Sequence, residues 1–128
     1  MKVLKFGGTS VGSVANINKV ISILKSVSKT EDCIDVVSAI GGITDKLIDA
    51  ADKAVEKNEL YLETYAHIES QHFHLIDTLI DDKSAQKRTQ NTVASKLKSL
   101  KQLLDGLYLI NELSPKTTDK LLSFGELM

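Results

Sequence analysis

The chain has 128 residues, of which 42% are hydrophobic and 26% charged, so it is long enough for one globular unit with a buried core. Its formal net charge is −1, and acids and bases are interleaved, which excludes a nucleic-acid or membrane partner recognised by charge. No signal peptide or transmembrane run is evident, so we expect a cytoplasmic protein. The single cysteine, Cys33, excludes an intrachain disulfide and is interpreted as a packing thiol.

A first strand is expected over about residues 2–6, and a glycine turn follows it. The turn belongs to one stretch: Lys5, Phe6, Gly7, Gly8, Thr9 and Ser10. Adjacent glycines allow close backbone approach, and the threonine and serine can cap the following helix, whose N-terminus favours an anion. The turn is therefore suited to a phosphate, with Lys5 as a positive charge beside it. The stretch matches neither the Walker nor the dinucleotide pattern, so an ordinary tight turn is the alternative.

Apolar residues at helical spacing predict a helix over about 12–28 that docks on a sheet. Its expected buried face has five members: Ile17, Val20, Ile21, Leu24 and Val27. The mostly apolar run at 34–39 predicts a second strand, covered on both faces. Strand, helix and strand in this spacing form a βαβ unit with parallel strands. A second glycine pair, Gly41 and Gly42, precedes another helix expected from about Thr44.

The two glycine turns should open on the same edge of the sheet, because adjacent parallel strands point the same way. This arrangement places five residues around one crevice: Lys5, Gly7, Gly8, Ser38 and Thr44. Ligands of open α/β sheets bind in such crevices, so the second turn favours a functional site over two ordinary turns.

From residue 58 onward, helical spacing predicts a long antiparallel hairpin that ends near Gly106, where a glycine suits a helix C-cap. Ser114 and Pro115 have the form of an N-cap and first helical residue, so a last helix should start there. Two strands make no stable open sheet, so we expect the first part of a longer α/β protein. His67 and His74 share a helix face, but no cysteine or paired acid completes a metal site, and none is expected.

Three motifs carry a resemblance to a known family. The stretch from Lys5 to Val11 resembles the N-terminal signature of the aspartate kinases, within the amino acid kinase family. Residues 36–39 with 42–44 are similar to that family's second loop, and residues 113–126 resemble its third element, a helix that ends in Ser-x-Gly-Glu. The three motifs occur in the family's order and span the whole chain.

The resemblance implies part of a three-layer α/β/α sandwich with a mainly parallel sheet. Residues 1–128 would be the N-terminal portion of the catalytic domain, here two strands with a helical hairpin and a C-terminal helix. Its expected parts are a βαβα unit with two glycine turns at 1–57, the hairpin at 58–113, and the start of a substrate-site helix at 114–128.

The implied activity is transfer of the ATP γ-phosphoryl group to the side-chain carboxylate of L-aspartate, giving 4-phospho-L-aspartate for lysine, threonine and methionine synthesis. By resemblance, residues 5–10 bind the phosphates and Lys5 is catalytic. Ser38, Thr44 and Glu126 would bind aspartate, with Glu126 pairing with its α-ammonium. Magnesium is expected with ATP, with ligands outside this chain. The expected protein is a homo-oligomer, and residues 1–128 alone should lack activity.

Two alternatives remain open from the sequence. Another member of the superfamily could act on glutamate, acetylglutamate, a carbamate or a nucleotide, since its Lys-x-Gly-Gly opening is widely shared. The chain could instead be a non-catalytic assembly module whose hairpin pairs with a partner.

Overall fold

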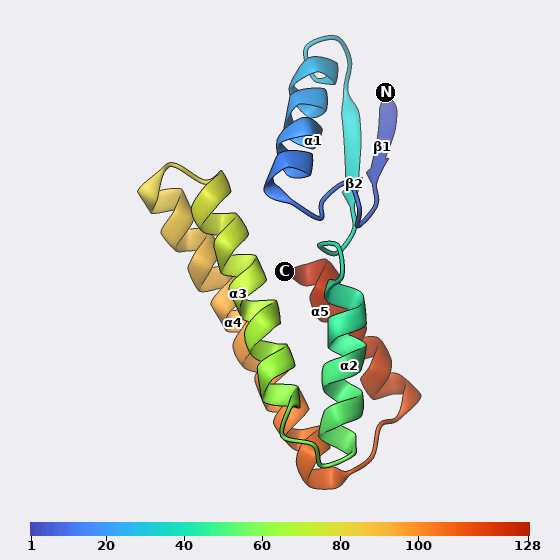
Figure 1. The fold of residues 1–128 in the computed structure, drawn as a ribbon. Coiled ribbons are helices and arrows are strands. Elements are labelled where there is room, and N and C mark those ends of the chain that lie inside the picture. Colours follow the sequence, from blue (N-terminus) through green and yellow to red (C-terminus); the bar gives the residue numbers. More distant parts are fainter.

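The computed structural model describes residues 1–128 and places a strand–helix–strand unit at one end of the molecule and four helices at the other (Figure 1). The first unit consists of β1 (Lys2–Phe6), α1 (Val14–Val27) and β2 (Cys33–Val37). The second consists of α2 (Ile43–Val55), α3 (Tyr61–Leu79), α4 (Lys83–Ile110) and α5 (Pro115–Leu127). None of the helices is both long and apolar enough to cross a membrane.

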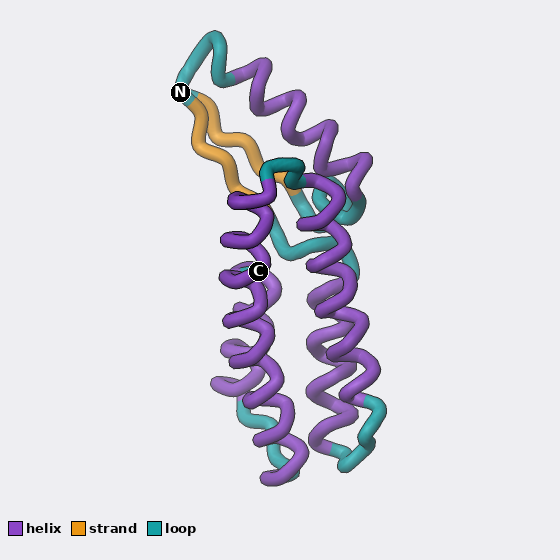
Figure 2. Tube along the Cα trace, turned by 90° about the vertical axis from the view of Figure 1, so that its left-hand side faces the viewer, coloured by secondary structure: helices purple, strands orange, loops and turns teal.

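β1 and β2 pair in parallel, with Lys2 opposite Cys33 and Phe6 opposite Val37, as a βαβ unit requires. α1 lies along this two-stranded sheet (Figure 2), where Phe6 shares a pocket with side chains of α1. Because side chains alternate along a strand, the opposite face carries Val3, Ile34 and Val36. These three side chains are 65%, 50% and 43% exposed.

The expectation that the second strand is covered on both faces is therefore wrong for residues 1–128, because the structure places no helix on the second face. The first helix is also less buried than the sequence predicts. Of its five predicted core residues only Val20 is buried, since a sheet of two strands is too narrow to cover a whole helix face.

The N-terminal cap of α1 differs from the prediction. The side chain of Ser13 accepts a hydrogen bond from the Asn16 amide at 3.2 Å, so neither Thr9 nor Ser10 caps the helix. The reason lies in the preceding turn, where the Ser10 amide donates to the Gly7 carbonyl oxygen at 2.9 Å. The chain thus completes a separate turn before the helix begins.

The second hairpin helix also ends later than the sequence predicts. α4 continues through Gly106 to Ile110 and ends at Asn111, whose φ of 64° is left-handed, as in a glycine C-cap. Leu107 explains the extension, because its side chain is buried in the helical core. The predicted start of the last helix is confirmed: the Ser114 hydroxyl accepts from the Thr117 amide at 3.2 Å, and Pro115 follows it.

The hydrophobic core lies among the four helices. It is a cluster of 15 buried residues, and every member comes from α2, α3, α4 or α5. The largest fully buried apolar side chains of this core are Ile43, Leu47, Ile68, Leu97, Leu100, Leu104 and Leu121. Burial of each such side chain contributes roughly 1.5–3 kcal/mol, so this bundle carries most of the hydrophobic stabilisation.

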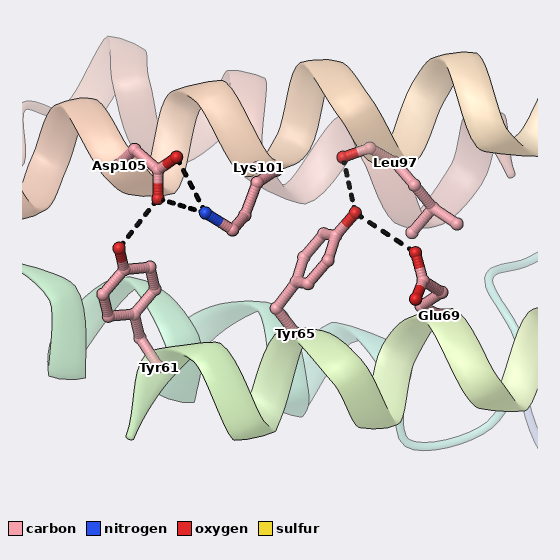
Figure 3. Close-up of polar contacts among 6 residues, drawn as sticks. All are labelled: Tyr61, Tyr65, Glu69, Leu97, Lys101 and Asp105. Atoms are coloured by element: carbon pink, nitrogen blue, oxygen red, sulfur yellow. Dashed lines mark hydrogen bonds and ion pairs between the residues drawn. The ribbon is translucent and has the colours of Figure 1, made fainter. Parts of the chain in front are cut away.

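Polar contacts join the two hairpin helices beside that core (Figure 3). The Tyr61 hydroxyl donates to Asp105 Oδ1 at 2.7 Å, and Lys101 Nζ donates to the same carboxylate from one turn earlier in α4. The Tyr65 hydroxyl donates to the Leu97 carbonyl oxygen at 3.2 Å. Burial raises the pKa of both tyrosines to about 12, which keeps their hydroxyls as donors. These contacts fix how α3 and α4 are placed along one another.

Candidate functional site

The two glycine turns lie directly against one another, as the parallel strands require. A Cβ atom on Gly41 would stand 2.9 Å from the Gly8 carbonyl oxygen and 3.1 Å from the Gly12 Cα atom. At the base of the turns, the Ser38 amide donates to the Phe6 carbonyl oxygen at 3.1 Å. The backbones therefore meet without intervening side chains, and glycine at position 41 is needed for this packing.

The second turn leads straight into α2. Gly42 occupies the N-cap position with a φ of 81°, a conformation that residues with a side chain rarely adopt. Thr44 lies in the first helical turn with its side chain exposed. Its hydroxyl makes no hydrogen bond to another residue of the chain, so it is free to contact a ligand.

The end of α5 docks on the second turn. A Cβ atom on Gly125 would lie 3.2 Å from the Ala39 Cβ and 3.3 Å from Leu47 Cδ1, so this glycine lets the helix approach closely. The next residue, Glu126, is exposed, and its carboxylate forms no ion pair within the chain. The three motifs, which are distant in the sequence, thus converge at the end of the parallel strands.

A cavity of about 350 Å³ lies where they converge. Ten residues line it: Val11, Ile17, Val20, Val37, Ser38, Ile40, Gly125, Glu126, Leu127 and Met128. Its walls are largely apolar, and Ser38 and Glu126 are the lining residues that have a hydroxyl and a carboxylate in their side chains. Apolar walls with a few polar groups are typical of small-molecule sites, and the carboxylate favours a cationic group such as an ammonium.

The other predicted site residues lie outside the lining of that cavity. Lys5 is exposed on the sheet face opposite α1 and has no ion-pair partner in the chain. Gly7 is exposed, and nothing lies within 4 Å of the position a Cβ would take, so a ligand could approach its backbone. The backbone of Gly8 is less open to a ligand, because a Cβ there would lie 3.3 Å from the Ala39 carbonyl oxygen.

The remaining residues of the first turn face α1. Phe6, Thr9 and Ser10 line a pocket of about 300 Å³ that also includes Lys19. The predicted phosphate-binding stretch therefore presents side chains to two different surfaces, with Lys5 on one and these three on the other. Any shared role in holding a phosphate would have to come from the backbone of the turn.

Two residues beneath the second turn carry no local signal in the sequence for a role at the site. Gln71 of α3 donates from Nε2 to the Gly41 carbonyl oxygen at 3.1 Å and accepts from Lys46 Nζ at 2.7 Å. The neighbouring His72 is 2% exposed and shares a cavity of about 180 Å³ with Ile40 of the same turn. A glutamine or histidine within a helix has no local pattern that distinguishes it, so only the tertiary contacts reveal these two.

His72 is held as a neutral side chain. Its Nδ1 lies 2.8 Å from the Ile68 carbonyl oxygen, and its Nε2 is buried without a partner. Burial lowers the pKa of His72, and the positive charge of Lys46 acts in the same direction, while the hydrogen bond to Ile68 opposes them.

No group of three or more histidine, cysteine, aspartate or glutamate side chains is placed to hold a metal ion. No preformed ligand set for a metal ion is therefore present in this chain, while Mg²⁺ beside a nucleotide commonly takes only one or two carboxylates together with the phosphates.

Comparison with known proteins gives a consistent result. The amino acid kinase family matches residues 1–128. Aspartokinase 1 and aspartokinase 2, both chloroplastic, from Arabidopsis thaliana are 33% and 35% identical to this chain over 127 and 130 residues. These matches cover 97% and 98% of this chain but 21% and 22% of the relatives, so the chain spans about a fifth of their length.

Solved structures agree. The crystal structure of E. coli aspartokinase III in complex with aspartate and ADP matches with a TM-score of 0.79 at 27% identity. The complex of the same enzyme with lysine and aspartate matches with a TM-score of 0.80 at 28% identity. Each covers 99% of this chain and 26% of the solved chain. The likeness confirms the expected α/β fold.

Proposed function

Because this chain belongs to the amino acid kinase family, we propose that it forms the N-terminal part of an aspartokinase. Such an enzyme transfers the γ-phosphoryl group of ATP to the side-chain carboxylate of L-aspartate and produces 4-phospho-L-aspartate. The observation that carries the proposal is the cavity that Ser38 and Glu126 line, with a hydroxyl and an unpaired carboxylate in their side chains. Similarity to aspartokinases over nearly the whole chain supports the same assignment.

The reaction brings an anionic carboxylate to an anionic phosphate, so catalysis depends on positioning and on neutralising charge. Lys5 is suited to the second task, since its ammonium has no partner within the chain. The exposed amide of Gly7 can approach the phosphate oxygens. Gly8 keeps the turn close to the second loop, so we assign it a supporting role through its backbone. Phe6, Thr9 and Ser10 complete the turn, and because the Ser10 amide already donates to the Gly7 carbonyl oxygen, we assign these three residues to phosphate binding through the shape that they give the turn.

The substrate aspartate carries an α-ammonium and two carboxylates. We assign the α-ammonium to Glu126, because its carboxylate has the opposite charge and no ion-pair partner within the chain. Ser38 lies in the same cavity and can donate to a substrate oxygen. Thr44, with a free hydroxyl in the first turn of α2, is proposed as a further contact at the rim.

ATP supplies the phosphoryl group, and Mg²⁺ is expected to accompany it. The residues of this chain offer no ligand set for the ion, so we assign its ligands to the part of the relatives' length that this chain does not match. For the same reason we propose that residues 1–128 alone lack kinase activity. The division at residues 57 and 113, the cytoplasmic location, the homo-oligomer and the lysine, threonine and methionine pathways stay predictions, and the relatives include chloroplastic proteins.

The test begins with the full-length protein that carries this sequence. Hydroxylamine traps acyl phosphates, so incubation with ATP should yield the hydroxamate with aspartate and not with glutamate or acetylglutamate. If the hydroxamate forms only with another acceptor, the protein is a different member of the family. Absence of product with every acceptor would favour an assembly module.

Lys5→Ala should then lower kcat by roughly 100-fold or more, as is typical when one preorganised donor to the transition state is lost. Lys5→Arg should also fail, because a planar guanidinium does not replace a compact ammonium at a glycine turn. Lys2→Ala is the matched control, since Lys2 lies on the same strand and pairs with Glu31 at 2.5 Å. A folded Lys5→Ala enzyme with near-normal turnover would remove Lys5 from the catalytic site.

A further inference from the structure

The middle of the second glycine turn is supported from α3 by one side chain. Gln71 Nε2 donates to the carbonyl oxygen of Gly41 at 3.1 Å, across 30 positions of sequence. No backbone N–H donates to that oxygen, so the glutamine is its only hydrogen-bond partner in the chain. The turn closes on itself through the Ile43 amide, which donates to the Ile40 carbonyl oxygen at 3.0 Å, and Gln71 supplies the one side-chain hydrogen bond that ties it to another helix.

The anchor is itself oriented. Lys46 Nζ donates to Gln71 Oε1 at 2.7 Å, which directs the amide nitrogen toward the turn. Lys46 belongs to α2, the helix that begins directly after the turn. The three groups therefore connect the turn, α2 and α3, and the half-buried amide is protected from competition with water.

The position of Gly41 bears on both parts of the site. The turn that contains it runs from Ser38 to Thr44, the two hydroxyl residues assigned to the substrate. On its other side Gly41 touches the carbonyl oxygen of Gly8 in the first turn. A displacement of Gly41 would therefore change the distance between the substrate contacts and the phosphate turn.

We propose that Gln71 is a positioning residue, which holds the second glycine turn, and with it Ser38 and Thr44, in place against the first turn. The inference rests on the proposed function for its kinetic consequence, while the anchoring contact is independent of it. Gln71 does not touch the reacting atoms. Its effect on the reaction passes through the Gly41 carbonyl.

Two substitutions separate the two bonds of the glutamine. Gln71→Glu can still accept from Lys46 but has no N–H to give to Gly41, and Gln71→Leu loses both bonds. We expect each to lower kcat/KM for aspartate about 10-fold or more, through a lower kcat and a higher KM for aspartate. The KM for ATP should change less, because the first turn keeps its own hydrogen bond between Ser10 and Gly7.

Gln86→Leu is the matched control. Gln86 Nε2 donates to the carbonyl oxygens of Ile80 and Asp77 at 3.1 and 3.3 Å, so the same type of bond to a loop is lost at the turn between α3 and α4. Gln86→Leu should lower the melting temperature about as much as Gln71→Leu does. Its kcat and KM should stay within about twofold of the wild type.

The measurements are steady-state kinetics on the full-length protein and amide hydrogen exchange over residues 39–44. Near-normal kcat/KM for aspartate in both Gln71 variants, or an equal loss in Gln86→Leu, would overturn the positioning role. A wild-type enzyme that forms no aspartyl phosphate would overturn the proposed function instead. In that case amide hydrogen exchange over residues 39–44 would test the anchoring contact by itself. Faster exchange in Gln71→Leu than in Gln86→Leu would support the contact from Gln71 to Gly41 as the anchor of the turn, and equal exchange would overturn it.

Discussion

The helical bundle and the strand unit lie at opposite ends of the molecule (Figure 1), and they differ sharply in how much side-chain surface they bury. All 15 members of the hydrophobic core belong to α2–α5, whereas in β1, α1 and β2 only Val20 is buried. Lys5 belongs to the thinly packed unit and Ser38 directly follows it. The residue proposed to act on the phosphate thus lies where the chain has little core of its own, whereas Thr44 and Glu126 belong to α2 and α5 of the bundle.

The difference indicates where the precision of the site comes from. The second glycine turn contacts the bundle through Gly125, which packs on Ala39, and through Gln71, which holds Gly41. A well-packed bundle can hold such contacts in fixed positions, because displacing it would disrupt a dense core. The bundle therefore positions a turn that the small sheet could not hold by itself.

The comparison is tested most strongly by truncating one side chain in each region. Leu100 is fully buried in α4, so Leu100→Ala should lower the free energy of unfolding by about 2–5 kcal/mol through lost contacts and the cavity left behind. Ile34 is 50% exposed on the open sheet face, and Ile34→Ala should cost less than about 1 kcal/mol. Urea denaturation followed by circular dichroism measures both, and equal losses would show that the two regions do not differ in packing.

The proposed role of the cavity between the two regions in binding aspartate is tested by Glu126→Gln in the full-length protein. Loss of the charge should weaken the binding of aspartate by roughly 2–4 kcal/mol and leave the binding of ATP nearly unaffected. Glu112→Gln is the control, because Glu112 is also exposed, precedes the start of α5 and lies outside the cavity. Steady-state kinetics decide the assignment, which is wrong if the KM for ATP rises as much as that for aspartate.

Glycines of the two turns should respond differently to an added methyl group. Gly41→Ala would bring a Cβ to 2.9 Å from the Gly8 carbonyl oxygen, so we expect a loss of about 1–3 kcal/mol in stability. Gly7→Ala meets nothing within 4 Å and should change stability by less than about 0.5 kcal/mol. Its effect should instead appear as weaker ATP binding. Thermal melts together with the KM for ATP separate the two roles, and a large loss of stability in Gly7→Ala would contradict the assignment.

His72 gives the smallest expected effect, a dependence of stability on pH within the bundle. Burial lowers its pKa below the ordinary 6.5, so below that pH the unfolded chain binds a proton that the folded chain does not. The free energy of unfolding should therefore fall as the pH drops from about 6.5 toward the folded pKa, by at most about 1.4 kcal/mol per pH unit.

His72→Leu should remove that component of the pH dependence, since an apolar side chain of similar size suits the buried site. His74→Leu replaces an exposed histidine on the same helix and should leave the pH dependence in place. Melting temperatures at about pH 7.5 and pH 5 measure the difference. A pH dependence unchanged by His72→Leu would show that another group is responsible.

The sequence alone determined the order of the elements and the convergence of the two glycine turns. Apolar spacing and the Ser114–Pro115 pair are local signals, and they predicted the parallel βαβ unit, the hairpin and the start of α5. Because parallel strands end at one edge, the meeting of the two glycine turns also followed from local patterns. Contacts within about one helical turn leave such a signature in the sequence.

Only the tertiary structure decided the rest. Burial of Leu107 carried α4 past Gly106 to Asn111, and a narrow two-stranded sheet left Val3 and Ile34 exposed. The bond from Gln71 to Gly41 joins residues 30 positions apart. A single contact between distant residues leaves no periodic pattern in the sequence, so these features depend on how the folded chain brings the bundle beneath the turn.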